Sequence, residues 1–315
     1  MIHQITILFI AIGLVCTASA QEKDLPYTSK IADLEEIRLE YKDFGGEGLP
    51  LIWVQDLHNY LEGSEGGHPF ARLMAELAAD FRVLAPVRRG YGKSTDTQWG
   101  YDVATQAMDL LRFMDAMGIE KACLFGGIPA TQDMLYIAEH HPDRLAGLVF
   151  NGSQVLYTGS QAPVILEFIE NFYAGSCDLE GRGMQIIGPR LAYRPDFLAN
   201  EQARIDVPLL LFRVPGFDDR NIYLGWLDQP DRLRQHHYCG NEEAIAYFNN
   251  LVSDPEAMQK LKVAFEETDL TGIVNKGFKR AFGDRLKTVE LDPSKELVSQ
   301  AAGQIREFYK TLKVD

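Results

Sequence analysis

The chain is short of positive charge and of residues grouped for metal binding. Its 31 lysines and arginines stand against 45 aspartates and glutamates, which leaves a formal net charge of −14 over 315 residues. An acidic surface repels phosphate backbones, so nucleic acid is excluded as a partner. Among the seven histidines and four cysteines there is neither a His-Glu-x-x-His motif nor a cysteine pair at zinc spacing. We therefore expect no metal and no cofactor.

Phosphate-binding glycine loops are also missing. No Gly-x-Gly-x-x-Gly follows an early strand, and no Gly-x-x-x-x-Gly-Lys-Ser/Thr occurs in the chain. Such loops bring backbone N–H groups against a nucleotide's phosphates, so their absence argues against a nucleotide-binding protein.

Long apolar runs are confined to the N-terminus. Residues 5–15 form a run of signal-peptide length, and Ala18-Ser19-Ala20 follows as a small-x-small cleavage pattern. We expect residues 1–20 to be a signal peptide and the mature chain to be exported, either periplasmic or secreted. The alternative is an uncleaved N-terminal anchor. No later segment is apolar enough to span a bilayer, so we expect no membrane span after cleavage.

Apolar strands and amphipathic helices alternate along the rest of the chain. The strands are expected at 37–41, 51–54, 81–85, 121–125, 145–150, 207–214 and 286–291, and the helices at 69–79, 103–117, 131–141 and 298–312. This rhythm predicts βαβ units and an α/β fold with a mostly parallel central sheet flanked by helices.

Two long stretches interrupt the rhythm. We expect residues 21–154 to form the N-terminal part of the core and 155–206 to form a helical cap insertion. Residues 207–315 then complete the core and carry a second insertion at about 216–283, with two or three helices. The aromatic residues of the first insertion are expected mostly to form its own small core.

Three motifs carry a family resemblance. Residues 89–94 read Arg-Gly-Tyr-Gly-Lys-Ser, residues 124–130 read Leu-Phe-Gly-Gly-Ile-Pro-Ala between a strand and a helix, and residues 141–144 read His-Pro-Asp-Arg. In this order and spacing they resemble the α/β-hydrolase superfamily. The resemblance implies a nucleophile on the sharp turn at 124–130, a histidine base, an acid and an oxyanion hole.

The sharp turn, or elbow, departs from the pattern. Gly126 and Ala130 take its two glycine positions, so the nucleophile position falls on Ile128, whose side chain has no proton to lose and no lone pair. The next residue, whose N–H the family uses in the oxyanion hole, is Pro129, which has no N–H.

The other catalytic parts are degenerate too. The usual oxyanion segment reads Gln55-Asp56-Leu57-His58-Asn59, which brings a carboxylate close to where negative charge would develop. The acid position falls on Asp218 or Asp219, or these are turn carboxylates. No histidine follows the last expected strand, because the last one in the chain is His237.

We therefore expect an inactive pseudohydrolase that binds a small apolar molecule or a protein partner. The alternative is an active ester or amide hydrolase, or a lyase, that uses relocated groups: Asp218 or Asp219, His58 and Ser153. The candidate pocket residues are Gln55, Asp56, His58, Gly127, Ile128, Pro129 and Ser153.

Three cysteines follow the signal sequence. Cys123 lies in an apolar strand and is expected to be a buried small hydrophobe. Cys177 and Cys239 lie in irregular segments of an exported chain, where they either pair as a disulfide or remain two free thiols.

Overall fold

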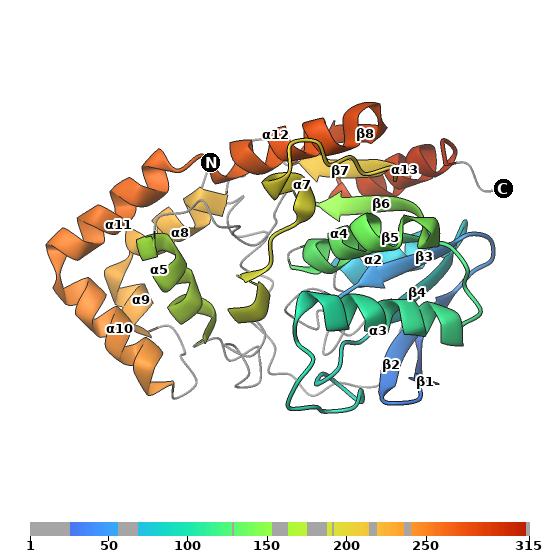
Figure 1. The fold of residues 1–315 in the computed structure, drawn as a ribbon, viewed down its shortest axis with the longest axis horizontal. Helices are drawn as coiled ribbons and strands as arrows, with labels where there is room; N and C mark the ends of the chain where they lie inside the picture. Colours follow the sequence, from blue (N-terminus) through green and yellow to red (C-terminus); the bar gives the residue numbers. More distant parts are fainter. Residues whose placement is uncertain are drawn as a thin grey trace.

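A single mixed sheet organises the computed structural model, which describes residues 26–55, 69–127, 129–152, 163–174, 188–190, 192–213, 219–235 and 241–312. The strands lie in the order β1-β2-β4-β3-β5-β6-β7-β8 (Figure 1). Their bounds are β1 Thr28–Asp33, β2 Arg38–Gly45, β3 Pro50–Val54, β4 Arg82–Pro86, β5 Ala122–Gly126, β6 Leu145–Asn151, β7 Leu209–Arg213 and β8 Leu286–Glu290. Strands β1 and β2 are antiparallel to their neighbours and the others run parallel. The mostly parallel α/β sheet is confirmed.

Helices cover both faces of the sheet. One face carries α3 (Val103–Ala116), α4 (Ala130–His140) and α12 (Leu270–Phe282), and the other carries α2 (Pro69–Leu77) and α13 (Leu297–Tyr309). Strand β3 shows why a buried strand is apolar throughout. Its Ile52 and Val54 side chains pack on the first face, while Leu51 and Trp53 pack on the second.

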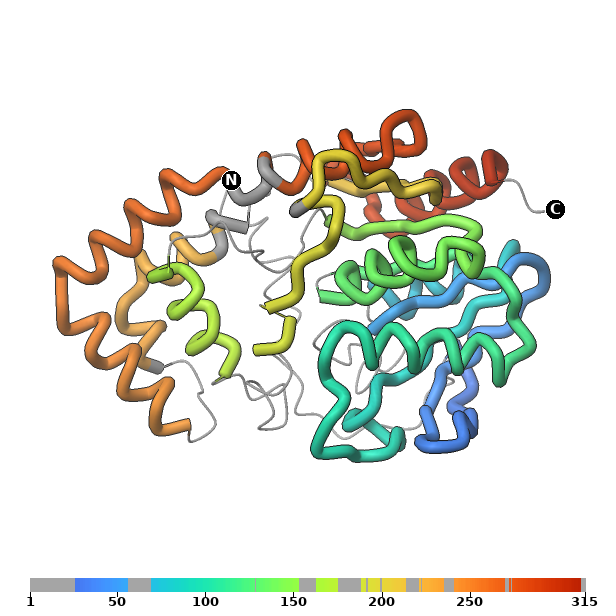
Figure 2. Tube along the Cα trace, viewed as in Figure 1, coloured from blue at the N-terminus to red at the C-terminus, as the bar shows by residue number. Residues whose placement is uncertain are grey.

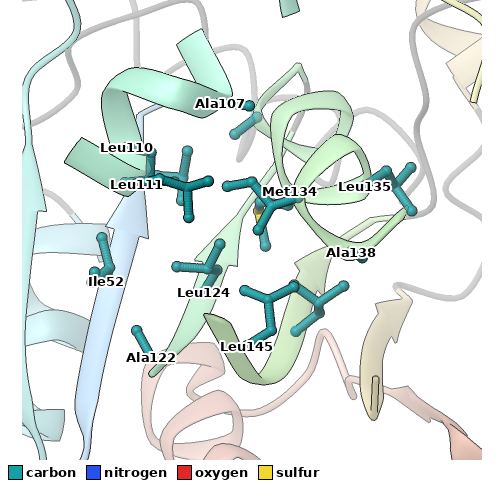
Figure 3. Close-up of a cluster of buried hydrophobic side chains, with 14 of the residues drawn as sticks. Ile52, Ala107, Leu110, Leu111, Ala122, Leu124, Met134, Leu135, Ala138 and Leu145 are labelled. Atoms are coloured by element: carbon teal, nitrogen blue, oxygen red, sulfur yellow. The ribbon is translucent and has the colours of Figure 1, made fainter. Parts of the chain in front are cut away.

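The packing around β5 holds the centre of the molecule. Leu124 of β5 lies among Leu110 and Leu111 of α3 and Met134 of α4, in a cluster of fully or nearly fully buried side chains (Figure 3). Burying each such side chain contributes about 1.5–3 kcal/mol. This cluster fixes the end of β5, and with it the start of α4, against the rest of the sheet.

The turn that follows β4 is braced by the residues of the Arg-Gly-x-Gly-x-Ser motif. The Arg89 guanidinium donates two hydrogen bonds of 2.7 Å to the Asp109 carboxylate of α3. Ser94 donates to the Val87 carbonyl and accepts from the Glu40 backbone. The motif therefore acts as a structural brace between β2, α3 and the loop after β4.

A group of helices lies to one side of the sheet (Figures 1 and 2). They are α5 (Pro163–Ala174), α8 (Asp219–Leu227), α9 (Pro230–Gln235), α10 (Glu242–Ser253) and α11 (Pro255–Glu267). Phe168 of α5 lies at their centre, with ring centroids 5.6–5.9 Å from those of Tyr223, Phe248 and Phe265. The two insertions thus share one aromatic core.

Among the described helices, none has the length and apolar character of a membrane span.

The second insertion contains more helices than the sequence pattern predicts. Two or three were expected, whereas residues 219–282 form the five helices α8 to α12 within the described parts of the chain. Local signals separate them: the Asp254 carboxylate accepts from the Glu256 and Ala257 N–H groups, and Pro255 opens α11. Helix α12 and the short α7 (Asp196–Ala199) pack on the core instead, where Phe278 stacks on Phe197 at 5.2 Å.

Candidate functional site

Strand β5 and helix α4 meet at the expected elbow. Strand β5 ends at Gly126 and α4 begins at Ala130, with the Thr131 N–H donating to the Gly127 carbonyl over 3.0 Å. A Cβ atom at Gly126 would lie 2.9 Å from the Ala130 Cβ and 3.0 Å from the Met134 sulfur. A glycine is required here because the helix approaches the strand too closely for any side chain.

Pro129 occupies the position that the sequence analysis assigns to an oxyanion donor. Ile128, at the nucleophile position, lies outside the described residues, but the residues on each side of it are described. Pro129 is buried at the N-cap of α4 and makes no side-chain cap hydrogen bond. Since proline carries no N–H, this position cannot donate to an oxyanion.

The position of the expected base is occupied by a turn. Strand β8 ends at Glu290, and Asp292 follows it. The Asp292 carboxylate accepts from the backbone N–H and hydroxyl of Ser294 and lies 3.2 Å from the Lys295 ammonium. The pKa of the Asp292 carboxyl lies below its usual value, and the hydrogen bond from the Ser294 hydroxyl is the largest cause. Asp292 therefore stabilises the turn that leads into α13.

The described residues include only some of the predicted site residues. Gln55, Gly127 and Pro129 are described, and the first two flank the carboxyl ends of β3 and β5. Predicted residues that lie outside the described residues are Asp56, His58, Ile128, Ser153 and Asp218, together with Cys177 and Cys239 of the expected disulfide. Asp219 begins α8, but its side chain is not among those described.

Cys123 is buried in β5, as expected. Burial raises the pKa of its thiol to about 12. A thiol with so high a pKa carries almost no thiolate at neutral pH, so Cys123 is not suited to act as a nucleophile. No group of three or more His, Cys, Asp and Glu side chains in the described ranges is placed to hold a metal ion.

Three charged side chains, two buried and one nearly buried, meet beside the elbow. Asp133 lies one turn into α4, Arg88 lies in the loop after β4, and Arg190 belongs to the stretch 188–190. The Asp133 carboxylate lies 2.5 Å from Nη2 of Arg88 and 3.0 Å from Nη1 of Arg190. Arg190 and Asp133 side chains are each 1% exposed, and that of Arg88 is 10% exposed. We call these three residues the Arg–Asp–Arg cluster.

Backbone and amide groups hold the cluster in place. Arg88 donates two hydrogen bonds to Gln55. Its backbone N–H donates to the side-chain Oε1 over 2.8 Å, and its Nε donates to the backbone carbonyl over 2.6 Å. Gln106 of α3 accepts from Nη1 of Arg88. The Arg190 carbonyl accepts from Gln132 of α4 over 2.9 Å. The cluster therefore joins β3, β4, α3 and α4 to the stretch 188–190.

Burial dominates the electrostatics of the cluster. The pKa of the Arg190 guanidinium is lowered, and burial is the largest cause. The Asp133 carboxylate raises this pKa, and the Arg88 guanidinium lowers it. Two guanidinium groups thus share one carboxylate among the described side chains. Sequence reasoning missed all three residues, because each reads as an ordinary surface charge until the fold brings them together. The one local signal is Asp133 itself, which lies among the buried residues of α4.

Known proteins agree with this architecture. The profile of the alpha/beta hydrolase fold family matches residues 57–176. The 2-hydroxymuconate semialdehyde hydrolase of Pseudomonas sp. (strain CF600) is 35% identical over 112 residues, which cover 34% of this chain and 38% of that protein. The matches span 30–38% of the length of the curated relatives.

Solved structures give the same fold over most of the chain. A bacterial membrane phospholipase A superposes with a TM-score of 0.55 at 15% identity, covering 98% of this chain and 91% of that one. An esterase from Rhodococcus sp. ECU1013 gives 0.52 at 16% identity, covering 91% and 100%. The chain therefore has the α/β-hydrolase fold.

The charge balance of the cluster predicts a ranking of variants. Asp133→Asn leaves two buried guanidinium groups without their carboxylate and should lower the free energy of unfolding by about 3–5 kcal/mol. Arg190→Met leaves the neutral Arg88–Asp133 pair and should lower it by less than half as much. Urea denaturation followed by circular dichroism measures both.

The exposed Asp231→Asn, whose side chain is 88% exposed, is the control and should change stability by less than about 0.5 kcal/mol. An Asp133→Asn protein as stable as the control would show that the cluster does not hold these segments together.

Proposed function

We propose that this chain is an α/β-hydrolase-fold protein without hydrolase activity, which binds a small molecule at the elbow. The observation that carries the proposal is the joint loss of three catalytic parts. Ile128 takes the nucleophile position, Pro129 takes the position of an oxyanion donor, and Asp292 follows the last strand in place of a histidine.

Each of the three losses removes a different contribution to lowering the activation barrier of hydrolysis. Removing one oxyanion donor typically costs about 10²–10³-fold in kcat. A positioned general base contributes about 10²–10⁴-fold. An aliphatic side chain at the nucleophile position prevents an acyl-enzyme from forming at all. One loss could be compensated by a neighbouring group, but these three together remove bond formation, proton transfer and charge stabilisation.

The names of the relatives favour a second candidate, an active hydrolase with relocated groups. The matching proteins include a hydrolase of a semialdehyde and an esterase. Such a site would need Asp218 or Asp219, His58 and Ser153 to meet within hydrogen-bond reach or through one water.

Replacing Ile128 tests the proposal. Ile128→Ser restores a hydroxyl, but Pro129 and the missing histidine leave it without an oxyanion donor and a base. We expect its hydrolysis of p-nitrophenyl butyrate to equal that of Ile128→Ala, which makes a similar truncation without a hydroxyl. Turnover by Ile128→Ser about 100-fold above Ile128→Ala, or turnover by the unmodified protein, would contradict the proposal.

We also propose that the chain is exported. The apolar run 5–15 and the Ala18-Ser19-Ala20 pattern support removal of residues 1–20. N-terminal sequencing of the protein recovered outside the cytoplasm should begin at Gln21, and Ala20→Gln should block processing, because the cleavage site requires a small residue. An unprocessed chain that begins at Met1 and fractionates with membranes would support an uncleaved anchor instead.

A further inference from the structure

The Arg–Asp–Arg cluster carries more positive charge than a structural brace needs. Asp133 could form a neutral buried pair with either Arg88 or Arg190, and each contact is within 3.0 Å. A second guanidinium in the same place adds an uncompensated charge, and a buried charge is costly unless it is paired. The surplus of one positive charge indicates that an anion from outside the described residues completes the site.

Two buried donors around the cluster lack an acceptor within the described ranges. They are Nε of Arg190 and Nε2 of Gln55, in side chains that are about 1% exposed. The orientation of the Gln55 amide is set by its neighbour: the Arg88 N–H can only donate, so the amide presents Oε1 to it and leaves Nε2 for an acceptor. Leaving a buried donor unpaired costs about 1–3 kcal/mol, so both donors favour an acceptor.

Both donors belong to residues that are linked to Arg88. Gln55 is hydrogen-bonded to Arg88, and Arg190 shares the Asp133 carboxylate with Arg88. Nη1 of Arg190 also lies 3.4 Å from the Pro129 carbonyl, which belongs to the elbow. The surplus charge and the two donors therefore lie next to the position where a superfamily enzyme would process its substrate.

We propose that this site binds the carboxylate of a small organic acid, between the Arg190 guanidinium and the Gln55 amide. A carboxylate brings one negative charge, which matches the surplus, and two oxygens, which match the two donors. A phosphate or sulfate dianion would reverse the charge and bring two further oxygens without donors. The inference rests on the proposed function, because it assigns the ligand class of a site that binds and does not react.

Acetate is the first probe, because it is the carboxylate alone. Thermal unfolding is followed at pH 7 with 100 mM sodium acetate, and with sodium chloride and sodium sulfate at the same ionic strength. Acetate should raise the Tm by about 2–4 °C over chloride, as expected for a Kd of about 10 mM. Acetamide, which has the same shape without the charge, should give no shift, and sulfate should match chloride.

Two variants link the response to the cluster. Arg190→Met should abolish the acetate shift, while Arg234→Met, which removes an exposed guanidinium from α9, should keep it. Gln55→Glu places a carboxylate of the protein next to Arg88. It should raise the Tm without acetate and remove the acetate response. Gln202→Glu adds the same charge at an exposed position and should do neither.

Equal shifts with acetate and chloride, or a Gln55→Glu protein that is less stable than the original, would overturn the proposal. Either result would mean that the chain neutralises the cluster itself. A larger shift with sulfate than with acetate would overturn the choice of a carboxylate. These outcomes are independent of the proposed inactivity, which is judged by ester turnover alone.

Discussion

The Asp133 carboxylate is the point where the sheet, the elbow and the stretch 188–190 are held together. It pairs with Arg88, which follows β4, and with Arg190. Asp133 lies within the first turn of α4, so the same contacts fix the elbow. Because these side chains are buried, each charge needs its partner: a buried charge that loses its partner destabilises the fold by several kcal/mol. Asp133 supplies the charge that pairs with Arg190, and the Gln132 amide and the Pro129 carbonyl also contact Arg190.

The packing at the elbow does not depend on which residue occupies the predicted nucleophile position. Gly126 is required by the close approach of Ala130 and Met134, whatever residue occupies position 128. Pro129 suits the start of α4, where its missing N–H removes no helical hydrogen bond. Asp292 likewise serves the turn before α13. Residues that would end catalysis are thus compatible with, or useful to, the fold.

The sheet could be predicted from sequence because its signals are local. Apolar runs such as 51–54 and 145–150 mark strands that are buried on both faces, and helical spacing marks α3 and α13. Strand β1 gave no such signal, since only Ala32 of its six residues is buried. The charged cluster could not be predicted, because Asp133 and Arg190 are 57 residues apart and only the folded chain brings them together.

The central claim, that no activated nucleophile remains, is tested most directly by a covalent probe. The purified protein is treated with a fluorophosphonate, which captures activated hydroxyl groups, and its intact mass is compared with that of a serine hydrolase treated in parallel. The account predicts an unchanged mass for this protein and a stoichiometric adduct for the control. A stoichiometric adduct on a serine or threonine of this protein would contradict the account, and peptide mapping would then identify the relocated nucleophile.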